Sequence, residues 1–152
     1  MNDFMNVRMF QPADWQEWRR MRCALWPDQT AAEHEKEMRA WLERSDTGVV
    51  LCARASGGLC GFAEVGTRPY ADGCHTSPVA FLEGWYVDPD MRRQRVGRAL
   101  VEAVELWARE CGLRELASDA LLENTVSQKA HDRLGFIEVE RAVRYRKALR
   151  DL

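Results

Sequence analysis

The sequence predicts an α/β domain built on a central, mixed sheet. Short apolar runs typical of strands alternate with apolar stripes at helical spacing, and turn residues separate them in the order βααβββαβαββ. The 152 residues are one domain's length. Because the chain has no internal repeat, low-complexity tract or linker, we expect residues 1–152 to form a single domain.

The first part of the chain predicts one strand and two helices. Residues 6–10 can form a strand, and Pro12 then stands where a helix begins. Trp26-Pro27 ends that helix, because a residue before proline avoids the helical conformation. Thr30 begins the second helix, and Glu33 completes a capping box.

A hairpin and then the fourth strand of the chain follow. Residues 49–53 and 59–65 are its two arms, joined by a glycine-rich turn. Residues 67–78 contain prolines and glycine and predict a long loop, which is uncommon without a function. The apolar run at residues 79–87 predicts a buried strand that Glu83 interrupts.

The second half predicts two helices and three strands. An apolar stripe predicts a helix from about Val96 to Glu110, with Gly112 as its stop. Residues 113–118 predict a strand, and residues 125–134 a short helix. The tail, residues 136–147, resembles two short strands.

Composition excludes several classes of protein. The net charge of −2 does not fit a nucleic-acid binder, and no apolar stretch approaches the length of a membrane span. The N-terminus lacks the pattern of a signal peptide. Five scattered cysteines without a C-x-x-C pair indicate reduced thiols in a cytoplasm. His34 and His75 lack neighbouring ligands at metal spacing, so we predict no metal.

The segment between the fourth strand and the next helix has the chemistry of a pyrophosphate site. Gly97 lets the backbone approach a ligand, and the first amides of the helix point outward without internal partners. Arg93 and Arg95 add formal charge. The alternative is a helix that begins with arginines on a solvated surface.

This segment resembles the GCN5-related N-acetyltransferases, whose motif Q/R-x-x-G-x-G/A is matched by Gln94, Gly97 and Ala99. A second family element, N-x-x-[AS] followed by LGF, is matched by Asn124, Ser127 and Leu134-Gly135-Phe136. The order of elements also matches over nearly the whole chain. The resemblance implies a mostly antiparallel sheet, flanked by helices, whose fourth and fifth strands splay apart.

The same resemblance implies where acetyl-CoA binds. The pantetheine arm would pair with the backbone of Trp85, Tyr86 and Val87, and Asn124 would reach it. A backbone N–H near Tyr86 would polarise the thioester carbonyl. The pyrophosphate would lie on the loop formed by Arg93, Gln94, Arg95, Val96, Gly97 and Arg98.

Further segments resemble the aminoglycoside 6′-N-acetyltransferases, which confer antibiotic resistance. They are Trp26-Pro27, Tyr70 with Asp72-Gly73-Cys74, Ser77-Pro78-Val79, Phe81-Leu82-Glu83-Gly84, Ala117-Ser118-Asp119 and Tyr145-Arg146-Lys147. This likeness implies that five residues face the aminoglycoside: Trp26, Tyr70, Glu83, Asp119 and Glu140.

Charge supports this placement, because a pocket for a polyammonium ligand needs carboxylates. Glu83 is the candidate general base, acting through one water, and Asp119 could help to hold and deprotonate the ammonium. Each has a structural alternative: Glu83 could pair with an arginine in a strand bulge, and Asp119 could cap a helix or turn. Glu140 could face solvent, and Trp26 and Tyr70 could be packing residues.

Direct transfer in a ternary complex is the expected mechanism, since Cys111 at a helix C-terminus is badly placed as a nucleophile. The general acid stays open between His131, Tyr145 and water. Other acceptors, such as a polyamine or a protein N-terminus, and an inactive acetyl-CoA sensor remain alternatives. A short C-terminal strand with an open edge makes a homodimer plausible.

Overall fold

The computed structural model describes residues 6–150. It contains a five-stranded sheet in the order β1-β2-β3-β4-β5. The strands are β1 (Asn6–Met9), β2 (Thr47–Ala53), β3 (Leu59–Arg68), β4 (Val79–Val87) and β5 (Leu116–Ser118). The helices are α1 (Trp15–Leu25), α2 (Ala31–Glu43), α3 (Val96–Glu110) and α4 (Thr125–Arg133), with short 3-10 turns at Pro12–Asp14 and Pro89–Met91.

By the density of its contacts the chain forms two units, one ending at Asp119 and the other beginning at Ala120. The first unit holds the whole sheet and α1 to α3, and the second holds α4. The sheet is mixed, since β1 to β4 pair antiparallel and β4 pairs parallel with β5. This confirms the predicted mixed, mostly antiparallel sheet.

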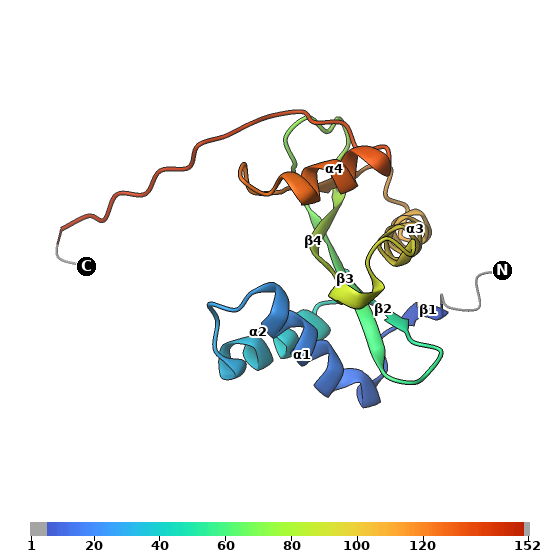
Figure 1. Ribbon diagram of the computed structural model, residues 1–152. Helices are drawn as coiled ribbons and strands as arrows, with labels where there is room; N and C mark the ends of the chain where they lie inside the picture. The colour runs from blue at the N-terminus through green and yellow to red at the C-terminus, as the bar shows by residue number, and fades with distance from the viewer. Residues whose placement is uncertain (1–5, 151–152) are drawn as a thin grey trace. The chain divides into compact units, whose positions relative to one another are not determined.

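Helices cover both faces of the sheet (Figure 1). Side chains from α1 and α2 pack on Val49, Leu51 and Phe62 in one apolar core. Residues next in sequence point to the other face, since side chains alternate along a strand. There Gly61 lies so close to α3 that an added Cβ would be 3.1 Å from Leu100.

β4 is paired on both edges over only part of its length. Ala80, Phe81 and Leu82 pair with β5, whereas within residues 6–150 the rest of β4 pairs with β3 alone. The register with β3 also shifts, because Leu82 and Gly84 face consecutive residues of β3. Glu83 is therefore the extra residue of a β-bulge, and the predicted splay between the fourth and fifth strands is confirmed.

Several predicted boundaries are corrected. The predicted strand at residues 113–118 is limited to Leu116–Ser118, and the second hairpin arm extends to Arg68. The two strands predicted for residues 136–147 are wrong: in the described chain this segment forms none, although it is drawn extended in Figure 1. A strand needs the backbone of a neighbour, and no described strand supplies one here.

The helix predictions hold. Thr30 caps α2, with Oγ1 accepting from the N–H of Glu33 and the Glu33 carboxylate accepting from the N–H of Thr30. α3 spans the predicted residues, Val96 to Glu110. Among the described residues, no helix combines the length and apolarity needed to cross a membrane.

Candidate active site

Glu83 projects from the bulge of β4 and is held by an arginine. Nε and Nη2 of Arg68, the last residue of β3, donate to the two carboxylate oxygens of Glu83 at 2.9 and 2.6 Å. The Arg68 guanidinium also lies over the ring of Phe81, 3.5 Å from its centroid. The arginine pairing considered as the structural alternative is therefore present, and it involves a side chain that is 42% exposed.

Asp119 follows β5 and is exposed. The hydrogen bond with Glu83 raises the pKa of Arg68 above its ordinary value, burial opposes this, and the charges of Glu83 and Asp119 raise it further. The two carboxylates predicted from the sequence thus act on one guanidinium. Sequence reasoning missed Arg68, because nothing in the local pattern marks the end of a hairpin arm as part of a site.

Trp26 lies directly against the bulge. A Cβ added to Gly84 would be 2.7 Å from Cη2 of Trp26, so the indole needs a glycine at this position. The ring also stacks with His34 and lies 4.8 Å from the Cζ atom of Arg22. Trp26 therefore packs on Gly84, the residue after Glu83, and its side chain is only half-buried.

Tyr70 stands on the loop between β3 and β4 and is 68% exposed. Its hydroxyl donates to the Asp72 carboxylate at 2.8 Å. The far end of the loop is anchored by Glu115, whose Oε1 accepts from the N–H groups of His75 and Thr76 at 2.8 and 2.7 Å. The loop thus has a fixed end, and sequence reasoning missed the residue that fixes it.

The start of α3 has the geometry expected of an anion site. Arg93 and Arg95 both have positive φ, 64° and 66°. Such left-handed residues are uncommon outside glycine and turn successive backbone N–H groups into an anion-binding concavity. Within the described chain, no side chain caps the N-terminus of α3. These features fit a pyrophosphate group, and the predicted cradle has a backbone conformation that suits it.

Gly97 allows α3 to pack closely on β4. An added Cβ would be 3.1 Å from the ring of Trp85, and the indole N–H donates to the Gly97 carbonyl at 3.2 Å. Gly97 thus lets β4 and the first turn of α3 lie close together. The sequence predicts that this glycine lets a ligand approach the backbone. The structure shows that it also makes room for the indole of Trp85.

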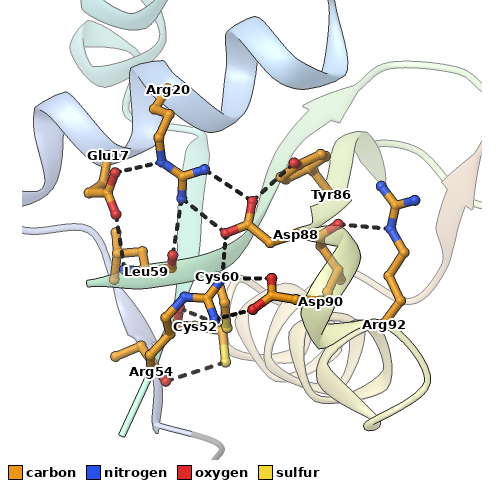
Figure 2. Close-up of polar contacts among 12 residues, drawn as sticks. Glu17, Arg20, Cys52, Arg54, Leu59, Cys60, Tyr86, Asp88, Asp90 and Arg92 are labelled. Atoms are coloured by element: carbon orange, nitrogen blue, oxygen red, sulfur yellow. Dashed lines mark hydrogen bonds and ion pairs between the residues drawn. The ribbon is translucent and has the colours of Figure 1, made fainter. Parts of the chain in front are cut away.

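An ion-pair cluster fixes the connection from β4 to α3 (Figure 2). Asp88 is buried and accepts from Arg20 at 3.0 and 3.1 Å, from Arg54 at 2.9 Å and from the Tyr86 hydroxyl at 3.0 Å. Arg54 also makes a bidentate pair with Asp90 at 2.7 and 2.9 Å. Burial alone would raise the pKa of Asp88, but these hydrogen bonds outweigh it and lower that pKa.

The end of β4 carries the backbone predicted to meet the pantetheine. Tyr86 and Trp85 pair with β3 on one edge, and the described residues provide no strand along the other. An unpaired strand edge is a template for an extended ligand. One acceptor there is already used, because Nε of Arg92 donates to the Val87 carbonyl at 3.0 Å.

The remaining candidates belong to the second unit. Asn124 caps α4, its side-chain oxygen accepting from the N–H of Ser127 at 3.1 Å. Nδ1 of His131 donates to the Ser127 carbonyl at 2.7 Å, since a carbonyl can only accept. Glu140 and Tyr145 are exposed on the tail that forms no strand in the described chain. Among residues 6–150, no three ligand-type side chains gather to hold a metal ion.

Comparison with known proteins defines the class. Residues 15–136 match the sequence model of the acetyltransferase (GNAT) family. The chain therefore belongs to this family. It is 46% identical over 146 residues to the aminoglycoside N(6′)-acetyltransferase type 1 of Klebsiella aerogenes, covering 94% of this chain and 96% of the relative. A relative of the same name from Stenotrophomonas maltophilia is 44% identical, and the alignment covers 94% of this chain and 93% of the relative.

Solved structures give the same result for the fold. The chain superposes with a TM-score of 0.89 and 38% identity on AAC(6′)-Iy in complex with the bisubstrate analogue CoA-S-monomethyl-acetylneamine, over 95% of this chain and 99% of that one. The aminoglycoside 6′-N-acetyltransferase AAC(6′)-Ih from Acinetobacter baumannii aligns with a TM-score of 0.88 and 36% identity, over 95% and 99% of the two chains.

Proposed function

We propose that this protein transfers the acetyl group of acetyl-CoA to the 6′-amine of aminoglycoside antibiotics and so confers resistance, with residues 1–152 acting as one acetyltransferase domain. The observation that carries the proposal is the carboxylate of Glu83, presented by a β-bulge where β4 leaves β5. It is supported by the relatives of 36–46% identity that bear this activity in their names.

The residues of the chain divide the work. When bound, acetyl-CoA supplies the thioester that the amine attacks. Asp119 pairs with the ammonium of the acceptor, and Glu83 takes one of its protons through one water, which frees the neutral amine to attack. The backbone N–H near Tyr86 donates to the thioester carbonyl as its charge grows. Transfer is direct, in a ternary complex: the carbon–sulfur bond of the thioester breaks, and the thiolate leaves with a proton from His131, Tyr145 or water.

The flanking residues bind the two substrates. Trp26 and Tyr70 offer aromatic surface to the aminoglycoside, and Glu140 offers a further carboxylate. The backbone of Trp85, Tyr86 and Val87 holds the pantetheine, together with Asn124. The pyrophosphate lies on the loop formed by Arg93, Gln94, Arg95, Val96, Gly97 and Arg98.

We also propose that the protein acts in the cytoplasm as a homodimer. The cysteines support this location, because all five thiols are free and none forms a disulfide. Support for the dimer comes from the tail, where Ile137, Val139 and Val143 are 84%, 60% and 69% exposed. A second copy that supplied a strand edge would bury these side chains and satisfy the backbone beside them.

The test is an assay of free thiol release from acetyl-CoA with kanamycin, tobramycin, gentamicin and spermidine. We expect release with the aminoglycosides and a product acetylated on the 6′ nitrogen. Glu83→Gln should reduce kcat by about 10²- to 10⁴-fold, the usual contribution of a general base. Turnover of spermidine alone, or full activity of Glu83→Gln, would contradict the proposal.

A further inference from the structure

We propose that Arg68 is a specificity-determining residue that occupies the acceptor's cation site: its guanidinium neutralises Glu83 until a polyammonium substrate displaces it. The inference rests on the proposed role of Glu83. It concerns a side chain that neither the sequence motifs nor the family likeness singled out.

The first argument is geometric. Arg68 makes the only bidentate contact to Glu83 within the described chain, with both carboxylate oxygens used, at 2.9 and 2.6 Å. An amine entering this bulge needs those same oxygens, because a carboxylate offers an ammonium the lone pairs that it offers a guanidinium. Substrate and Arg68 therefore compete for one acceptor.

The second argument is charge. Glu83 and Asp119 both raise the pKa of Arg68, and the hydrogen bond to Glu83 is the largest cause. The guanidinium therefore stays positive at every working pH and cannot leave by losing a proton. An incoming cation that pairs with Glu83 must move the whole side chain aside.

The third argument concerns the cost of that movement. The side chain of Arg68 is 42% exposed and that of Glu83 is 26% exposed, so the pair borders solvent. Exposed ion pairs contribute little, and the flat guanidinium rests on Phe81 by its face. Moving Arg68 into solvent therefore costs only an exposed ion pair and the contact of the guanidinium with the ring.

Displacement makes the site selective for ligands with several cations. A monoamine gains little binding free energy at Glu83, because its one ammonium only replaces the guanidinium of Arg68. A polyammonium ligand gains further pairs with carboxylates such as Asp119, and these favour exchange. By occupying the acceptor position, Arg68 would thus set a threshold that a ligand with a single cation does not pass at ordinary concentrations.

The experiment compares Arg68→Met with the wild-type protein. Methionine is an unbranched, largely apolar side chain that removes the charge and both hydrogen bonds to Glu83. We expect the KM for kanamycin to fall about threefold to fivefold, the worth of an exposed ion pair. The KM for the monoamine glucosamine should fall by a similar factor, because both substrates must displace the same guanidinium. A raised or unchanged KM for either substrate would overturn the proposal.

Arg44→Met is the matched control. Arg44 is 44% exposed, lies over an aromatic ring and pairs with a neighbouring carboxylate, Asp46. Its charge acts on Glu83 from a distance, and it makes no described hydrogen bond to that carboxylate. The control removes one positive charge from the same region, so an equal fall in KM would assign the effect to net charge and reject displacement.

A second variant separates competition from damage to the site. In Glu83→Gln the negative charge and one acceptor oxygen are lost, so adding Arg68→Met should no longer change the binding of kanamycin measured by calorimetry. Persistence of the full effect would overturn the inference. If the wild-type protein acetylated no aminoglycoside, the proposed function would fail; if it did so and Arg68→Met matched it, the inference alone would fail.

Discussion

Two glutamates on paired strands have different environments. Glu64 of β3 faces Gly84 across the bulge and is buried, with Oε1 accepting from the Trp18 indole at 2.9 Å and from Arg22. Glu83, next to Gly84, points to a position that borders solvent. The bulge separates them, because the extra residue re-aims one side chain while the other stays in the core.

Glu64→Gln should destabilise the fold. The change keeps the size of the side chain but leaves the charge of Arg22, itself buried, with Glu37 as its remaining carboxylate partner among the described residues. We expect the free energy of unfolding to fall by about 3 kcal/mol, as when one member of a buried pair is removed. Urea unfolding followed by tryptophan fluorescence measures this loss.

Glu37→Gln is the control for that measurement. Glu37 binds the same guanidinium, but its side chain is 48% exposed against 4% for Glu64. Its removal should cost less than about 1 kcal/mol, since solvent screens the pair. Equal losses for the two variants would mean that burial does not set the strength of this pair.

At the scale of elements, side chains from other parts of the fold hold the connection from β4 to α3. Arg20 of α1 and Arg54, just after β2, converge on Asp88, and Arg54 also holds Asp90 (Figure 2). The backbone then passes through the two left-handed arginines into α3. The conformation of the proposed pyrophosphate loop therefore depends on strands and helices outside it.

Arg54→Met should weaken acetyl-CoA binding without slowing transfer. The change removes the contacts of Arg54 with Asp88 and Asp90, whereas Arg20 still holds Asp88. The loop therefore loosens while the protein stays folded. We expect the KM for acetyl-CoA to rise about fivefold to tenfold with kcat nearly unchanged, the effect of lost uniform binding. Initial rates at varied acetyl-CoA concentrations test this.

Arg19→Met is a suitable comparison, because Arg19 pairs with Glu35 between α1 and α2. Its KM for acetyl-CoA should equal that of the wild-type protein. A fall in kcat for Arg54→Met with constant KM would show that Arg54 does not act through the loop.

At the scale of the whole molecule, the two units differ in how their apolar side chains are covered. The first unit buries Trp18, Phe62 and Leu100 completely between the sheet and its helices. In the tail of the second unit, Ile137 and Tyr145 are 84% and 91% exposed. Such a row of apolar side chains is unusual on a monomer's surface and fits a surface that pairs with a second copy.

Ile137→Asp should therefore lower the molecular mass in solution. We expect sedimentation equilibrium to give twice the chain mass for the wild-type protein and a lower average for the variant, since a buried charge opposes association. Leu106→Asp, at an exposed apolar position on α3, should leave the mass unchanged. A wild-type protein with the mass of one chain would contradict the dimer.

The sequence by itself determined the elements whose signals are local. Pro12, the Thr30–Glu33 capping box and the apolar stripe of residues 96–110 set helix positions that the structure confirms. The order of elements then gave the mixed sheet, and the motif at Gln94 and Gly97 gave the family. Each of these depends on residues a few positions apart, where capping and periodicity act.

Only the tertiary structure decided the partners. Arg68 meets Glu83 because two strands pair across a bulge, and Arg54 meets Asp88 across 34 residues of chain. The tail is the opposite case. Its residues alternate as in a strand, yet it forms none, because no strand of the described chain pairs with it. Periodicity reports which face a side chain takes, whereas a strand or an ion pair exists only where a second segment supplies its atoms.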